Sequence, residues 1–194
     1  MRSIKLLGLS AVVALALTAF VGVSSAFAVQ WNPQNTVTST TLKAGTSVVM
    51  TDNRGSTVTC NTVNGFNLSP IGGNPAVSGT TNSSGAPAPP TFSNCTSSLG
   101  SATVTGSGQW LFTATSSTNV NESNASATIK IAGGFCTITM TNVSIPNNTW
   151  SNSTHQLTSN SGASFPIHES GFCDGATSSK VSGVSQSPST VTIN

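Results

Sequence analysis

The densest group of ionisable and metal-binding side chains in the sequence is His168, Glu169, Cys173 and Asp174. Imidazole, thiolate and carboxylate are the groups that bind zinc, so this spacing could hold a metal ion. In an oxidising compartment, however, Cys173 would form a disulfide, and charged residues between strands usually lie on solvated loops. We therefore expect no metal site here. His155 is the other histidine, and it has no comparable neighbours.

Motifs for catalysis are missing from the sequence. Serine hydrolases place the nucleophile in G-x-S-x-G, and the segment 162–166 lacks the second glycine. Glycosidases need two carboxyl groups on one cleft, and nothing in the sequence places two together among Asp52, Glu122, Glu169 and Asp174. We therefore expect no enzymatic activity, no catalytic residue and no cofactor.

Tryptophan side chains are the remaining candidates for ligand binding. Trp110 and Phe112 lie two residues apart, so a strand would place both rings on one face, an arrangement more typical of a core than of a binding platform. Trp150 stands in a polar stretch and is the tryptophan that we expect to be exposed, whereas Trp31 lies near the amino end. An exposed Trp110 or Trp150 could stack on a sugar ring. Burial of all three would exclude this hypothesis.

The elements that must position these side chains are strands. Alternation of apolar and polar residues predicts them at 36–42, 46–51, 56–60, 102–105, 109–115, 127–132, 135–143, 153–158, 163–168, 180–185 and 190–193. No segment after residue 28 has a sustained helical period. Many short strands between turn residues favour an antiparallel sandwich or barrel. We predict a single all-β domain over 29–194, an antiparallel β-sandwich of immunoglobulin-like or related type.

Two hairpins and one loop are predicted from local signals. Gly133-Gly134 separates the β-branched runs 127–132 and 135–143, which is a specific hairpin signal and would direct Ile129, Ile131, Ile138 and Met140 to one core. Glycines at 106 and 108 suggest a second hairpin between 102–105 and 109–115. The Gly-, Ser- and Pro-rich stretch 78–90 is expected to be a flexible exposed loop.

Residues 1–28 have the features of a cleavable secretory signal. Arg2 and Lys5 precede an apolar run, and Ala26-Phe27-Ala28 fits the small-residue pattern of signal peptidase. The alternative is an uncleaved anchor, because the apolar run approaches the roughly 18 to 20 residues that span a bilayer. We expect cleavage after Ala28, no transmembrane segment thereafter, and a secreted, extracellular protein, free or associated with the cell surface.

An exported chain with an even number of cysteines is expected to form disulfides. Three pairings of Cys60, Cys95, Cys136 and Cys173 are possible. Loops of similar size favour Cys60–Cys95 and Cys136–Cys173, each contributing roughly 3 to 4 kcal/mol in the chain-entropy model.

Charge excludes one class of partner. Without Arg2 and Lys5 the chain keeps Lys43, Arg54, Lys130 and Lys180, which its four carboxylates balance. Binding to a nucleic-acid backbone needs clustered Lys or Arg, so we expect no nucleic-acid partner.

Short segments around the cysteines resemble those of a loose group of proteins. Thr57–Cys60, Phe92–Cys95 and Phe135–Thr139 look like the corresponding segments of uncharacterised small secreted four-cysteine β-proteins of actinobacteria. The resemblance implies a β fold and an extracellular location, and no activity. We expect a non-enzymatic extracellular or cell-surface protein with a structural or interaction role. Its partner would be a cell-surface protein or, in the carbohydrate-binding alternative, a glycan.

Overall fold

The structure is a computed structural model that describes residues 29–32, 38–64, 66–69, 76–78, 89–187 and 189–194. The expected signal at 1–28 and most of the loop predicted at 78–90 lie outside the described residues. The first strands are β1 (Trp31–Asn32), β2 (Thr38–Leu42), β3 (Val48–Asp52), β4 (Thr57–Asn64), β5 (Phe66–Ser69), β6 (Ala76–Ser78), β7 (Thr91–Ser97), β8 (Gly100–Ser107) and β9 (Leu111–Ala114). They are followed by β10 (Asn119–Ile131), the 3-10 turn η1 (Ala132–Gly134), β11 (Cys136–Ser151), β12 (Gln156–Thr158), β13 (Ser164–Pro166), β14 (His168–Gly171), β15 (Ser178–Ser182), β16 (Val184–Gln186) and β17 (Thr192–Ile193). In the described part of the chain no helix has the length and apolar character needed to cross a membrane.

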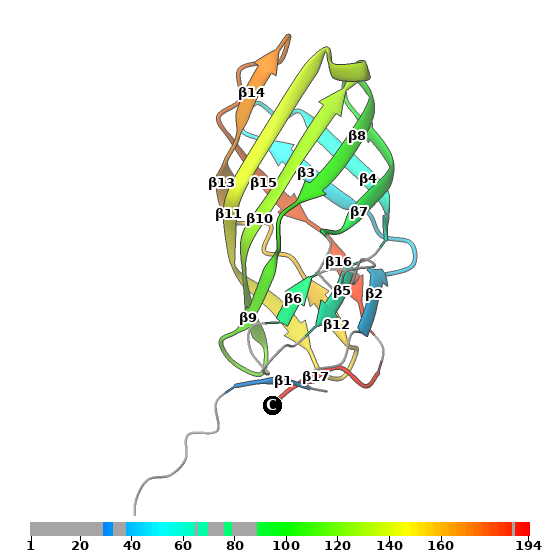
Figure 1. Cartoon of the computed structure of the whole chain (residues 1–194), viewed down its shortest axis with the longest axis vertical. Helices are drawn as coiled ribbons and strands as arrows, with labels where there is room; N and C mark the ends of the chain where they lie inside the picture. Colours follow the sequence, from blue (N-terminus) through cyan, green and yellow to red (C-terminus); the bar gives the residue numbers. More distant parts are fainter. Residues whose placement is uncertain (1–28, 33–37, 65, 70–75, 79–88, 188) are drawn as a thin grey trace, which may run out of the picture.

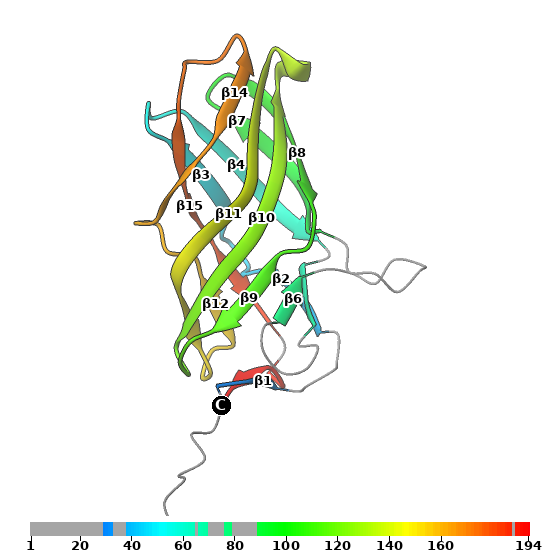
Figure 2. The same ribbon diagram turned by 60° about the vertical axis from the view of Figure 1, so that its left-hand side comes forward.

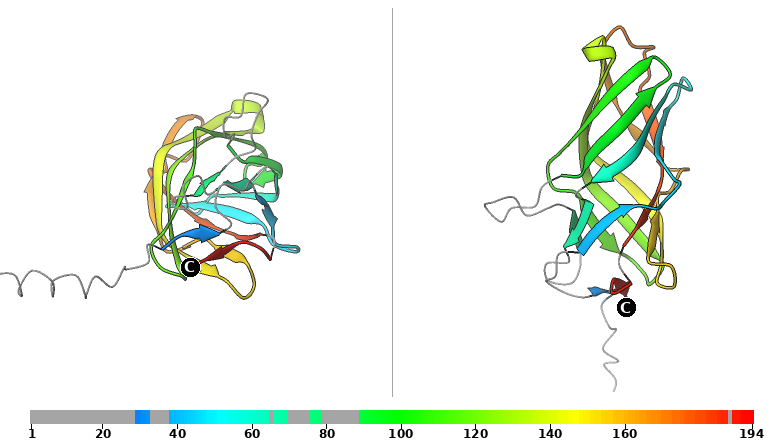
Figure 3. Two further views of the ribbon diagram at one scale, coloured as in Figure 1. Left: turned by 60° about the horizontal axis from the view of Figure 1, so that its bottom comes forward. Right: turned by 90° about the vertical axis from the view of Figure 1, so that its right-hand side faces the viewer.

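All strands except β1 and β17 belong to one antiparallel sheet, which is strongly curled into a half-barrel (Figure 1). The strand order is β13-β15-β3-β4-β7-β8-β10-β9-β6-β5-β2-β16-β12-β11-β14, with a further pairing of β10 with β11. In the lower half, successive ladders lead from β10 through β9, β6, β5, β2, β16, β12 and β11 back to β10. Seen from below, the strands surround a common interior (Figure 3).

The expected all-β antiparallel class is confirmed, but the strands do not divide into the two facing sheets of a sandwich. Strands β10 and β11 run along most of the molecule (Figure 2). They pair with β8 and β14 in the upper half and with β9 and β12 in the lower half. Because these two strands belong to both halves, the sheet is continuous and buries its apolar residues by curling.

One predicted hairpin is confirmed and the other is wrong. Strands β10 and β11 pair through η1, with Ile129 opposite Ile138 and Ala127 opposite Met140. The buried side chains include the four that were expected to share a core, which are Ile129, Ile131, Ile138 and Met140. Strands β8 and β9 do not pair with each other, because β10 lies between them. The chain crosses from one side of β10 to the other between β8 and β9, at 108–110.

The two long strands change their inward face at asparagine residues. Odd-numbered residues of β10 are buried over 125–131, whereas Glu122 is buried before this stretch. The ladder between β10 and β11 shifts on either side of Asn124, where φ is 58°. Strand β11 has φ of 49° at Asn142 and 58° at Asn147. Asparagine tolerates this left-handed conformation better than most residues. Each of these asparagines marks a β-bulge, an extra residue in one strand, which shifts the alternation of buried and exposed residues by one and bends the strand.

Both predicted disulfides are present. Cys60 and Cys95 lie directly opposite each other on β4 and β7, and their sulfurs are bonded. Cys136 begins β11 and is bonded to Cys173, which follows β14. The first disulfide therefore links two neighbouring strands on the inner face, and the second ties the loop after β14 to the upper end of β11.

The two ends of the described chain meet below the sheet. Strand β1 pairs with β17, so that Trp31 lies opposite Ile193 (Figure 1). Trp31 is fully buried, donates from Nε1 to the carbonyl oxygen of Phe112 at 2.9 Å, and packs edge-to-face on Trp150 with ring centroids 5.0 Å apart. This pair of strands covers the lower end of the interior.

Candidate functional site

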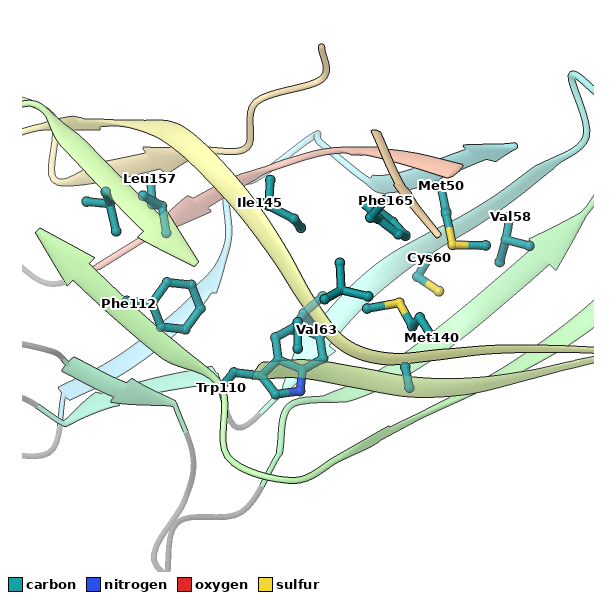
Figure 4. Close-up of a cluster of buried hydrophobic side chains, with 14 of the residues drawn as sticks. Met50, Val58, Cys60, Val63, Trp110, Phe112, Met140, Ile145, Leu157 and Phe165 are labelled. Atoms are coloured by element: carbon teal, nitrogen blue, oxygen red, sulfur yellow. The ribbon is translucent and has the colours of Figure 1, made fainter. Parts of the chain in front are cut away.

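The interior of the curled sheet contains a cavity of about 120 Å³ whose walls are almost entirely apolar. Met50 and Val58 form part of one wall, and Trp110, Phe112 and Ile145 contribute from the others. Figure 4 shows the labelled side chains pointing toward one another from different strands of the sheet. An apolar cavity of about 150 Å³ is large enough to bind benzene or xenon. The somewhat smaller cavity of this protein therefore accepts only a compact molecule with few atoms.

Glu122 is the one ionisable residue among the described residues that line this cavity. Only 7% of its surface is exposed, and its neighbours on β9 and β11 are Phe112 and Ile145. Its carboxyl group has no hydrogen-bonding or charged partner in the described part of the chain. Burial raises the pKa of Glu122 from its ordinary value of 4.5 to about 7, because the charged form loses its hydration.

The bulge at Asn124 accounts for the inward position of Glu122. Counting back in steps of two from Ala125 would direct Ser123 and Asn121 to the interior. The extra residue reverses this phase, so that Glu122 and Val120 are buried instead. Strict alternation in the sequence therefore assigns Glu122 to the wrong face.

A more open surface hollow adjoins the cavity at the turn between β2 and β3. It is lined by residues of this turn, including Lys43 and Gly45, and by Asn61 and Thr62 of β4. Thr41, Leu42 and Val63 line both the hollow and the cavity. The cavity and the surface hollow are therefore adjacent at these three residues.

The tryptophan platform that the carbohydrate-binding alternative requires is not formed, and the expectation that Trp150 is exposed is wrong. Trp31, Trp110 and Trp150 are exposed by 0%, 8% and 1% respectively, so none offers its face to a sugar ring in solution. Trp150 is buried because its Nε1 donates to Asn152 Oδ1 at 2.6 Å and its ring packs on Trp31. Trp110 keeps a place among the candidate ligand-binding residues, but inside the cavity.

Three carboxylates that are distant in the sequence meet near the upper end of the sheet. Oxygens of Asp52, Glu169 and Asp174 lie within 4.8 Å of one another. We expected no two carboxyl groups to lie together, and this expectation is wrong because β3, β14 and the loop after β14 are brought together. Cys173 is in a disulfide and is not available as a zinc ligand, and His168 is exposed on β14.

Hydrogen bonds within the chain account for these three carboxylates. Asp52 Oδ1 accepts from the backbone N–H groups of Arg54 and Ser56 at 2.8 and 2.9 Å. Glu169 Oε2 accepts from Gly175 N and Ala176 N, each at 2.9 Å, and Asp174 Oδ2 accepts from Ser56 Oγ at 2.6 Å. These three carboxylates therefore stabilise turns through hydrogen bonds, whereas the carboxyl group of Glu122 accepts none in the described part of the chain.

Two phenylalanines at the upper end are exposed together. Phe135 and Phe172 are exposed by 58% and 72%, and their rings stack with centroids 4.7 Å apart. Phe172 N donates to the carbonyl oxygen of Phe135 at 2.8 Å, which holds the two segments in register.

Comparison of the chain with protein-family models, with curated proteins and with solved structures finds no match, so the candidate site rests on its own geometry.

Proposed function

We propose that this protein is an exported, non-enzymatic binding protein whose interior cavity holds a small molecule that is mainly hydrocarbon. The observation that carries the proposal is the cavity of about 120 Å³ inside the sheet, with a lining that is almost entirely apolar. Protein interiors are normally packed without voids of this size, since a void forfeits contacts between its lining atoms. A molecule that filled the space would restore those contacts.

Two further features support this proposal. Disulfides join Cys60 to Cys95 and Cys136 to Cys173, in keeping with an oxidising compartment outside the cell. Glu122 has no second carboxyl beside it among the described lining residues, whereas glycosidic hydrolysis uses a pair. The site is therefore better suited to holding a molecule than to transforming it.

Binding can be followed through two methionine methyl groups. Met50 and Met140 both line the cavity, and the third methionine of the sequence is Met1. With ¹³C-methyl methionine labelling, titration of the full chain with methylcyclopentane at pH 6 should shift both cavity signals saturably. Replacing Met50 and Met140 in turn by leucine assigns the two cavity signals, and a signal that remains in both variants belongs to Met1 of the expected signal peptide.

A filled cavity provides the matched control. Ala127→Leu adds a larger side chain at a lining position and should abolish the methylcyclopentane response. Thr128→Leu makes a comparable change at the next position of β10, on the opposite face, and should leave the response intact. Absence of any saturable shift in the unmodified chain would refute the proposed function.

An interaction with a cell-surface protein is the second candidate function, and the exposed pair Phe135 and Phe172 is the observation that favours it. Large exposed apolar side chains gathered at one place are typical of contact sites. The Phe135→Ser/Phe172→Ser variant should lose binding to the native cell surface, while Glu122→Gln should retain it. Equal binding by both variants would remove the support for this second function.

A further inference from the structure

We infer that the ligand of the interior cavity carries a basic amine, which pairs with the carboxylate of Glu122. This inference rests on the proposed function and adds the chemical class of the ligand. It comes from a mismatch within the cavity, where Glu122 is the single ionisable residue in a lining that is otherwise almost entirely apolar.

A buried carboxyl group normally has a partner. Burying a polar group without a compensating hydrogen bond costs free energy, and burying an unpaired charge costs more. The other carboxylates of the described chain follow the rule, because Asp52, Glu169 and Asp174 each accept hydrogen bonds. Glu122 is enclosed by Phe112 and Ile145 and accepts none in the described part of the chain. The exception therefore calls for a partner from outside.

The described part of the chain supplies no cation to Glu122. Neither β9 nor β11, the strands that flank Glu122, contains a lysine, arginine or histidine. Lys130 lies on the same strand as Glu122, but its side chain is on the exposed outer face. Lys43 lies at the surface hollow and not in the cavity. A positive charge or a set of N–H donors must come with the ligand if the ionised carboxyl is to be compensated.

An ammonium group meets this requirement better than a neutral group. It provides several donors and a full charge in a site of low polarity, where a charge-assisted hydrogen bond is about twice as strong as a neutral one. The remaining cavity wall is apolar, so the rest of the ligand must be hydrocarbon. Its size is limited by the cavity to a compact ring or a short branched chain.

Three probes of nearly the same shape test the inference. Cyclopentylamine, cyclopentanol and methylcyclopentane differ only in whether an amino, hydroxyl or methyl group is attached to the same ring. Their affinities for the full chain are measured through the Met50 and Met140 methyl signals at pH 8. We expect the amine to bind at least about tenfold more tightly than either neutral probe, as is usual for a hydrogen bond to a charged group.

The pH dependence has a defined sign. The amine remains protonated throughout, since alkylamines titrate near pH 10, whereas Glu122 has a pKa of about 7 and gains a proton as the pH falls. Affinity for cyclopentylamine should therefore fall about tenfold between pH 8 and pH 6, while affinity for methylcyclopentane should not fall. No other ionisable group of the described residues lines the cavity, so the effect is assigned to Glu122.

Substitution of the two glutamates completes the test. Glu122→Gln should reduce amine binding at least about tenfold and keep methylcyclopentane binding, whereas Glu169→Gln, outside the cavity, should change neither. If the amine binds no more tightly than its neutral analogues, the inference is overturned while the proposed function stands. If methylcyclopentane binds at neither pH, the proposed function fails, and the inference that rests on it fails with it. The wild-type comparison of probes at two pH values decides the matter even if Glu122→Gln does not fold.

Discussion

The carboxyl group of Glu122 loses its surrounding water and gains no partner from the described chain, and this burial costs the most free energy when the group is ionised. The strands around Glu122 therefore determine the pH at which its carboxyl group ionises. At a pH near 7 the side chain is divided between its two protonation states, so a small change in pH or the arrival of a ligand changes its charge.

Glu122 should make the unliganded protein less stable as the pH rises. Burial raises the pKa of Glu122 from 4.5 to about 7, so between these values the folded chain holds a proton that the unfolded chain has released. The free energy of unfolding should therefore fall by about 3 kcal/mol across this window and then level off above it. Urea unfolding at a series of pH values measures this loss.

Glu122→Gln isolates this effect from the titration of the other carboxyl groups. The difference in free energy of unfolding between the wild type and Glu122→Gln should change by about 3 kcal/mol between pH 4 and pH 8, with the wild type losing stability. Glu169→Gln serves as the control, because its carboxylate accepts two backbone hydrogen bonds and lies outside the cavity. A difference that stays constant with pH would show that Glu122 is solvated in the folded protein.

In strand β10, the backbone conformation of Asn124 determines which face of the sheet carries Glu122. Asn124 adopts φ of 58° and marks the point where the alternation of β10 reverses. The same bulged ladder lets β10 and β11 continue from the upper to the lower half of the sheet. The position of Glu122 and the curvature of the sheet thus have a common origin.

Substitutions at Asn124 should separate backbone conformation from side-chain contacts. Asn124→Val places a β-branched residue in a left-handed conformation and should lower the free energy of unfolding by about 1 to 3 kcal/mol. Asn124→Gly accepts this conformation and should stay within about 0.5 kcal/mol of the wild type. Chemical denaturation measures both. Because Asn124 is exposed, an equal loss in the two variants would mean that its side chain, and not its φ angle, stabilises the bulge.

Structural features that depend on residues close together in the sequence were predicted correctly. Period-two alternation placed most strands, and Gly133-Gly134 predicted the β10–β11 hairpin correctly because a short connection leaves few alternative pairings. The same reasoning failed for β8 and β9, where a strand from later in the sequence is inserted between the two. Glu122 was missed as a site residue because no strand was predicted at 119–126, and the Asn124 bulge would have reversed the alternation extended from the predicted strand at 127–132. The only signal for it was an isolated carboxyl in a β-rich segment.

Arrangement of the whole sheet depends on contacts that no local pattern reports. The acidic group at Asp52, Glu169 and Asp174 and the β1–β17 pair join residues that are far apart in the sequence. The two-sheet expectation failed for the same reason, since alternation shows that one face of a strand is buried but not against what. A curled sheet and a sandwich produce the same period of two.

Closure of the lower end by β1 and β17 leads to a prediction for the molecule as a whole. Trp31 of β1 connects the β1–β17 pair to the large sheet, because its ring packs on Trp150 and its Nε1 donates to the Phe112 carbonyl oxygen. Asn152 joins the same assembly, because its Nδ2 donates to the Ile193 carbonyl and its Oδ1 accepts from Ile193 N, each at 2.8 Å.

Trp31→Ala should lower the free energy of unfolding by about 3 to 5 kcal/mol, because it removes a fully buried aromatic side chain whose space cannot be refilled locally. Phe172→Ala also removes an aromatic ring, but one that is 72% exposed, and should change stability by no more than about 0.5 kcal/mol. Urea midpoints of the two variants make the comparison. A loss for Trp31→Ala as small as that for Phe172→Ala would mean that β1 and β17 do not close the sheet in solution.

Since Phe112 lines the cavity and also accepts the Trp31 hydrogen bond, Trp31→Ala should in addition weaken methylcyclopentane binding.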